Sequence, residues 1–243
     1  MKQHLIKSAL LFFPAAFFAM AVNAEIILID FGQSASATTV PGTYWNNVTS
    51  KSGNIADLRD NSTDTGVATG IAMNLTGFSN VNNFNGNVDA DAAMFDAFEA
   101  ATVITDAIYT AETGGLGTLS FTGLNASKTY NLTITAARNN TEERYSRYGV
   151  SGHGTQILQV AGDSPAAGNG VNWNNDDFVT FSNITGVTSL DLTVQGSKST
   201  AFTNINVWGY IGAVQIEVIP EPSTFALFAL SGIAGLVAFR RRK

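Results

Sequence analysis

The chain of 243 residues contains no cysteine. It therefore has no disulfide framework, no thiolate metal site and no cysteine nucleophile. Burial of apolar side chains must stabilise the fold instead. The stretch between the two ends of the chain, about 195 residues, is long enough to bury a sizeable core, and all-β sandwiches commonly reach this length as one domain. We expect one domain over residues 25–219.

Basic residues are also scarce. Six of the 13 Lys and Arg residues lie in the first seven or the last four positions. The stretch from Glu25 to Glu221 keeps seven basic residues against all 19 acidic ones, a net charge near −12. This negative charge makes nucleic acid, anionic lipid and acidic polysaccharide poor partners unless a cation intervenes. It is also typical of a soluble protein outside the cell.

The common motifs of hydrolases and nucleotide-binding enzymes are absent. The sequence has no G-x-S-x-G elbow, H-E-x-x-H pair or Gly-rich phosphate loop. After signal removal the one remaining histidine is His153, in an SGHG stretch whose glycines indicate a tight turn. Glu142 and Glu143 are adjacent, so on a strand they would face opposite sides and make a poor acid/base pair. We expect no catalytic residues and a protein that is not an enzyme; a hydrolase is the less favoured alternative.

The N-terminus has the pattern of an export signal. Lys2 and Lys7 precede an apolar stretch over residues 9–22, and small residues follow. This pattern predicts a signal peptide over residues 1–24, removed by signal peptidase between Ala24 and Glu25. A permanent anchor is disfavoured because the apolar run is short and Pro14 interrupts it.

The C-terminus has a second apolar run, over residues 225–239, followed by four basic residues. At about 1.5 Å per residue, a helix over this run spans roughly 22 Å of a hydrocarbon core about 30 Å thick. It is therefore a marginal transmembrane helix, and the basic residues should stay in the cytoplasm. Immediately before it, Pro220 and Pro222 hold Glu221 in an extended segment that a protease can reach.

Pro-Glu-Pro, a short apolar helix and an Arg-rich end occur in this order and resemble the PEP-CTERM sorting signal. The resemblance covers residues 220–243. It implies that an exosortase, an integral membrane enzyme of Gram-negative bacteria, recognises Pro220, Glu221 and Pro222 and releases or transfers the protein. The helix over residues 225–239 would then occupy the inner membrane only transiently. The implied destination is the cell surface or extracellular matrix.

Between the two ends, apolar and polar residues alternate with a period of two, which predicts strands with one buried face. The predicted buried faces are Leu119 and Phe121; Tyr130, Leu132, Ile134 and Ala136; Leu190, Leu192 and Val194; and Val214, Ile216 and Val218. Residues 26–32 are apolar on both faces, as in a central strand covered on both sides. Closely spaced turn clusters favour an antiparallel β-sandwich over βαβ units.

One segment breaks the pattern. In residues 89–102, Met94, Phe95 and Phe98 have helical spacing, which predicts one short helix covering an open end of the sandwich. The strand and turn motifs from ILIDFG to YIGAVQIEV also resemble a β-sandwich domain that recurs in exosortase substrates and is akin to galactose-binding-like jelly rolls. This second resemblance implies a jelly roll, a fold that often binds glycans.

Sugar rings stack on aromatic side chains, and their hydroxyls need fixed polar partners. Three clusters of residues offer both. The candidate ligand-binding residues are Trp45 and Asn46 in the first cluster, Arg138, Arg144, Tyr145, Arg147 and Tyr148 in the second, and Trp173 in the third. If residues 144–148 form a strand, Tyr145 and Arg147 share one face while Arg144 and Tyr148 share the other, so at most half of that cluster serves an exposed site. Packing in the sandwich is the alternative for each aromatic residue.

We expect no cofactor, with calcium as the alternative. Loop oxygens that calcium prefers occur at Asp57, Asp60 and Asp64, at Asn87, Asp89 and Asp91, and at Asp176 and Asp177, but none completes a calcium-loop pattern. The predicted function is non-catalytic: binding or organising extracellular polysaccharide in a biofilm. The alternative is a protein–protein interaction or structural surface module that binds no glycan.

Overall fold

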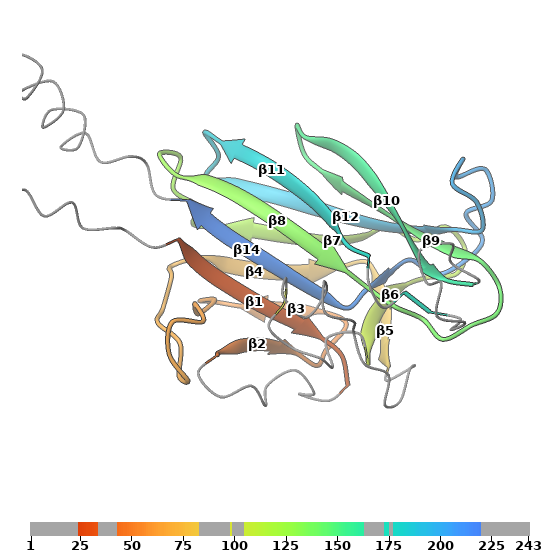
Figure 1. Ribbon diagram of the computed structural model, residues 1–243, viewed down its shortest axis with the longest axis horizontal. Coiled ribbons are helices and arrows are strands. Elements are labelled where there is room, and N and C mark those ends of the chain that lie inside the picture. The colour runs from red at the N-terminus through yellow and green to blue at the C-terminus, as the bar shows by residue number, and fades with distance from the viewer. Residues whose placement is uncertain are drawn as a thin grey trace, which may run out of the picture. The chain divides into compact units, whose positions relative to one another are not determined.

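The computed structural model describes residues 24–33, 43–82, 98, 105–162, 173–174 and 177–219, and these residues are rich in β-structure (Figure 1). The strands are β1 (Glu25–Phe31), β2 (Trp45–Val48), β3 (Gly53–Ile55), β4 (Ala72–Thr76), β5 (Phe78–Asn82), β6 (Ala107–Thr110), β7 (Gly117–Thr122), β8 (Thr129–Thr135), β9 (Arg144–Val150), β10 (Gly154–Ala161), β11 (Val179–Thr185), β12 (Ser189–Ser197), β13 (Tyr210–Ile211) and β14 (Ala213–Ile219). Of the predicted helix only Phe98 is described; it is helical and buried.

The described strands form three sheets. One has the order β11-β8-β14-β1-β2, a second β10-β9-β12-β7-β4-β3 and a small third β13-β6-β5. Neighbours are antiparallel except β1 and β2, which pair in parallel. A parallel neighbour needs a crossover of a dozen or more residues, and the chain between Phe31 and Trp45 has that length. The sequence pattern did not reveal this pairing.

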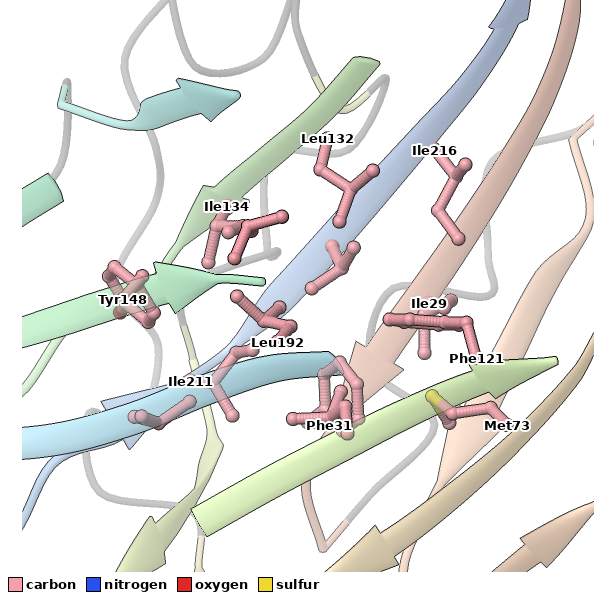
Figure 2. Packing of buried hydrophobic residues seen from close by; sticks show 14 of the residues in the cluster. Ile29, Phe31, Met73, Phe121, Leu132, Ile134, Tyr148, Leu192, Ile211 and Ile216 are labelled. Carbon is pink, nitrogen blue, oxygen red and sulfur yellow. The ribbon is translucent and has the colours of Figure 1, made fainter. Parts of the chain in front are cut away.

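The two large sheets pack face to face as a β-sandwich. Figure 2 shows the interior, where side chains from both sheets point toward one another. Ile29, Leu132 and Ile216 come from the first sheet, and Phe121 and Leu192 from the second; all are buried in one apolar cluster. The predicted alternation is therefore confirmed in these strands.

Strand β1 confirms the expectation of burial on both faces. Ile27 and Ile29 belong to the core cluster, while Leu28 points to the other face and is also fully buried. The strand lies between β14 and β2 in its sheet. Its continuous apolar sequence is explained by this central position.

The two ends of the sandwich core lie side by side. Glu25, at the start of β1, pairs with Val218 near the end of β14. The carboxylate of Glu25 also accepts a hydrogen bond from Lys128 Nζ at 3.2 Å. The predicted signal peptide and C-terminal helix lie outside the described residues. Within the described part of the chain, no helix is long and apolar enough to cross a membrane.

Candidate functional site

A pocket of about 210 Å³ lies where the small third sheet meets the sandwich. Its lining residues are Asn82, Tyr109, Arg138, Trp208 and Tyr210, and we call it the Trp208 pocket. β5, β6 and β13 supply Asn82, Tyr109 and Tyr210, while Arg138 follows β8 and Trp208 precedes β13. Because Tyr210 lies just before β14 begins, the pocket is at the opposite end of β14 from Ile219.

The aromatic rings of the Trp208 pocket hold one another in place. The ring centroids of Tyr109 and Trp208 are 6.1 Å apart with an edge-to-face angle of 80°. Tyr109 and Tyr210 are also 6.1 Å apart, tilted by 39°. Trp208 is half-buried, whereas Tyr210 is 1% exposed. The indole of Trp208 is thus fixed by its neighbours and still reaches the surface.

Arg144 packs against this aromatic group. Its guanidinium carbon lies 5.0 Å from the ring centroid of Trp208. Its Nη1 donates to Tyr210 Oη at 3.4 Å, and its Nη2 donates to Glu142 Oε2 at 3.3 Å. Lys198 Nζ lies 3.4 Å from the same oxygen of Glu142. Arg144 is 7% exposed, so its main role in this geometry is to position Trp208 and Tyr210.

Strand β9 also fixes the backbone of Tyr210. Tyr148 Oη donates to the carbonyl oxygen of Tyr210 at 2.7 Å, and the Tyr210 amide donates to Ser146 Oγ at 2.8 Å. Burial raises the pKa of Tyr148 above its ordinary value. Burial also raises the pKa of Tyr210, although the nearby Arg144 cation opposes the shift. Both phenols therefore stay neutral near pH 7.

The predicted alternation along β9 is confirmed. Arg144 and Tyr148 point inward and are buried, whereas Tyr145 and Arg147 lie on the outer face and are partly exposed. Arg147 donates to Gln195 Oε1, and its guanidinium carbon lies 4.5 Å from the ring centroid of Phe202. The cluster is therefore split, with Arg144 beside the Trp208 pocket and Arg147 on the opposite face of the strand.

Trp45 and Asn46 have packing roles in the structure. Trp45 is 2% exposed and Asn46 is 5% exposed. Asn46 Nδ2 donates to the carbonyl oxygens of Leu28 at 2.9 Å and Arg59 at 2.8 Å, and its Oδ1 accepts from the Arg59 amide at 2.9 Å. These contacts tie β2 to its neighbours. Neither residue lines the Trp208 pocket.

Trp173 is half-buried and forms an isolated bridge with Ala161. It does not line the Trp208 pocket either. Of the eight predicted ligand-binding residues, Arg138 lines the pocket and Arg144 packs against it. The sequence interpretation missed Asn82, Tyr109, Trp208 and Tyr210, although Trp208 and Tyr210 closely follow Asn206 and so offer the aromatic and polar residues that marked the predicted clusters.

The described aspartates of the calcium hypothesis mostly cap turns. Asp60 Oδ1 accepts from the Val67 amide at 2.8 Å and from Ser62 Oγ at 2.8 Å, and Asp57 Oδ1 accepts from the Gly70 amide at 2.9 Å. In the described part of the chain no three His, Cys, Asp or Glu residues are grouped to hold a metal ion. Asn87, Asp89, Asp91 and Asp176 lie outside it, so calcium binding stays a prediction.

Comparison with known proteins identifies the C-terminal end of the chain. Residues 218–243 match the family model described as the PEP-CTERM protein-sorting motif. This match confirms the predicted motif, whose presence indicates export and processing by an exosortase. No curated protein matches the chain.

Solved structures give only distant similarities. A plant complex of the peptide RALF23 with FER and LLG2 has 12% identity and a TM-score of 0.43, over 65% of this chain and 52% of that one. The plant receptor-like kinase ANX1 has 8% identity and a TM-score of 0.38, over 67% and 52%. TmCBM61 in complex with beta-1,4-galactotriose has 13% identity and a TM-score of 0.27, over 59% and 80%.

The matches span about half the length of the two plant structures. None of the three similarities is high enough to assign the fold or a ligand. What the comparisons establish is that this chain ends in a PEP-CTERM sorting motif, the mark of an exported protein that an exosortase processes.

Proposed function

We propose that this protein is a non-catalytic polysaccharide-binding protein of the cell surface or biofilm matrix and that its ligand enters the Trp208 pocket. The observation that carries the proposal is the combination of an accessible indole with Arg138 and Asn82 in one pocket. An aromatic face stacks on a sugar ring, while guanidinium and amide groups hydrogen-bond its hydroxyls. The five described lining residues include no carboxylate or histidine, the usual general acids and bases, which favours binding over hydrolysis.

The position of the pocket agrees with sorting through the C-terminus. β14 has seven residues, so its two ends are separated by about 20 Å. The pocket lies beyond one end, and the sorting motif follows the other. In the order of the chain, Pro220–Pro222 therefore follow the end of β14 that is away from the pocket.

The fold and the boundaries complete the proposal. We assign residues 25–219 to a galactose-binding-like jelly roll, supported by two large sheets that are antiparallel except for the β1–β2 pair and that have the first and last strands side by side. Residues 1–24 would be removed by signal peptidase. Residues 220–243 would hold the protein in the inner membrane of a Gram-negative bacterium until the exosortase acts.

The proposal is tested with protein purified from the cell surface or medium after export. A glycan array should show binding to a restricted set of polysaccharide fragments, with no turnover of glycosides or esters. Co-purification of one protein partner, without binding to any glycan, would instead establish the interaction-module alternative. Hydrolysis of a bound glycan would establish an enzyme.

A further inference from the structure

The outer face of the six-stranded sheet carries a row of polar groups away from the core. On β9 the outward positions are Tyr145, Arg147 and Gly149. On β12 they are Asp191, Thr193 and Gln195. Gly149 pairs with Thr193 on one side and with Thr155 of β10 on the other, and Arg147 pairs with Gln195. None of these outer positions belongs to the core cluster.

A hollow of about 440 Å³ lies over Gly149, next to the β9–β10 turn. The lining residues are Gly149, Val150, Ser151, Gly152, Gly154, Thr155, Asp191 and Thr193. A Cβ atom at Gly149 would lie 2.7 Å from Thr193 Oγ1 and 3.4 Å from Thr155 Cγ2, so the side chains of these two threonines cover the buried glycine and form the floor of the hollow.

The hollow offers fixed polar groups. Thr193 Oγ1 donates to the Gly149 carbonyl at 3.1 Å, which holds that hydroxyl over the floor. Ser151 Oγ accepts from the Asp191 amide at 3.3 Å. Within the described residues the carboxylate of Asp191 makes no hydrogen bond or ion pair, and the residue is exposed. Its two oxygens can therefore accept from a ligand.

Arg147 continues the row two residues along β9. Its guanidinium is held between Gln195 and the ring of Phe202. Phe202 has a φ of 52°, which is unfavourable for an aromatic residue, and its amide donates to Ser199 O at 3.1 Å. Strained backbone of this kind often occurs at ligand-binding sites. The turn thus places an aromatic ring and a pre-oriented guanidinium at one end of the row.

We propose that this outer face is a second glycan site, in which a neutral polysaccharide chain lies along β9 from the hollow over Gly149 to Arg147 and Tyr145. The proposal rests on the glycan-binding role of the protein but not on the Trp208 pocket. Three outward positions on one strand span about 13 Å, so more than one sugar unit fits. Sugar hydroxyls would donate to Asp191 and accept from Arg147.

The charges on this face select a neutral chain. Asp191 lies at the hollow, and the core has a net charge near −12, so a carboxylated glycan would approach against repulsion. A neutral chain with many hydroxyls uses both Asp191 and Arg147 as partners. Two sites on one molecule would also let it hold one polymer at two points or join two chains, with a gain in avidity.

The test is an NMR titration of the exported protein carrying Trp208→Ala, which removes the indole of the first pocket. The probes are neutral hexaoses of glucose, mannose and galactose, with oligogalacturonate as the acidic comparison. A neutral hexaose should shift the amide signals of Gly149, Gly152 and Gly154. Adding Asp191→Ala should weaken that binding at least tenfold. Adding Asn74→Ala, an exposed change on β4 of the same sheet, should leave it unchanged.

The possible outcomes separate the two sites. Shifts confined to residues around the pocket in the wild type, with none at the three glycines, overturn the second site and leave the first. Shifts at the glycines that persist without Trp208 support the second site, even if the first pocket binds nothing. Three other results would overturn the proposal. These are shifts with oligogalacturonate only, shifts that depend on the protein concentration and not on the probe, and no shift with any probe.

If the Trp208→Ala protein does not fold, calorimetry of the wild type replaces the titration. Asp191→Ala should lower the stoichiometry of a neutral hexaose by one, from two to one if the Trp208 pocket also binds and from one to none if it does not. A stoichiometry of one in both proteins would overturn the second site.

Discussion

Replacing Arg144 or Arg147 by alanine should have very different effects on stability, although the two residues are close in sequence and have the same side chain. Arg144→Ala removes a buried guanidinium that contacts Trp208, Tyr210 and Glu142. Arg147→Ala removes a partly exposed one that contacts Phe202 and Gln195. The alternation along β9 makes them a matched pair.

The contacts of Arg144 give the expected magnitude. A cation–π contact contributes about 0.5–2 kcal/mol. The long bond to Tyr210 contributes about 1 kcal/mol, and the loss leaves a buried phenol without this donor. The ion pair with Glu142 adds little, about 0–1 kcal/mol, because that carboxylate is 56% exposed and keeps Lys198 as a partner. We expect Arg144→Ala to lower the free energy of unfolding by about 2–4 kcal/mol.

Arg147→Ala should lower the free energy of unfolding by about 1 kcal/mol or less, because the cation–π contact of Arg147 is near the surface. Urea unfolding of both variants and of the wild type, followed by tryptophan fluorescence, gives the two differences. In a domain of this size each kcal/mol corresponds to roughly 2–4 °C in melting temperature. Equal losses, or a larger loss for Arg147→Ala, would refute the assignment of Arg144 to the interior. If Arg147 serves the second glycan site, its replacement should weaken glycan binding by about 1–3 kcal/mol while the fold persists.

Two further predictions concern processing and pH. Intact-mass analysis of the mature protein should show a chain that starts at Glu25 and lacks Arg240 to Lys243; a mature species that keeps those basic residues would show that the tail is only an anchor. Burial raises the pKa of Tyr148 in the folded protein, so as the pH rises this phenol ionises first in the unfolded protein, near pH 10. The contribution of Tyr148 to stability is therefore intact below pH 10, and the free energy of unfolding falls by about 1.4 kcal/mol per pH unit above pH 10. Urea unfolding between pH 9 and 11 should therefore show a shallower decline for Tyr148→Phe than for the wild type, and identical slopes would contradict this reasoning.

The strand faces could be predicted because burial in a sheet follows a local period of two. Leu192, for example, is buried between the exposed Asp191 and the partly exposed Thr193, as its sequence pattern requires. The parallel pairing of β1 with β2 could not be predicted, because which strands become neighbours depends on contacts between distant segments. The same holds for the third sheet, in which β6 joins β5 to β13.

The candidate site was only partly predictable for the same reason. Arg138 and Arg144 were found because they lie close together in a sequence with few basic residues. Tyr109 and Trp208 are 99 positions apart, and only the fold brings their rings into contact. Trp45 and Tyr148 have the residue types of a sugar-binding site, but their burial assigns them to packing. Residue type alone does not distinguish an exposed aromatic side chain from a buried one.

Calorimetric titration of the best array ligand into three proteins tests directly whether the Trp208 pocket binds glycan. The proteins are the Asp191→Ala variant as the reference, the same variant with Trp208→Ala added, and the same variant with the control Phe178→Ala added, which removes an aromatic side chain that is 40% exposed and does not line the pocket. Asp191→Ala weakens the second glycan site in all three proteins, so the comparison reports on the Trp208 pocket. If the indole of Trp208 stacks on the sugar, we expect at least a tenfold loss of affinity, about 1.4 kcal/mol, for Trp208→Ala and no change for Phe178→Ala. Equal affinity of all three proteins, with Trp208→Ala still folded, would contradict this expectation.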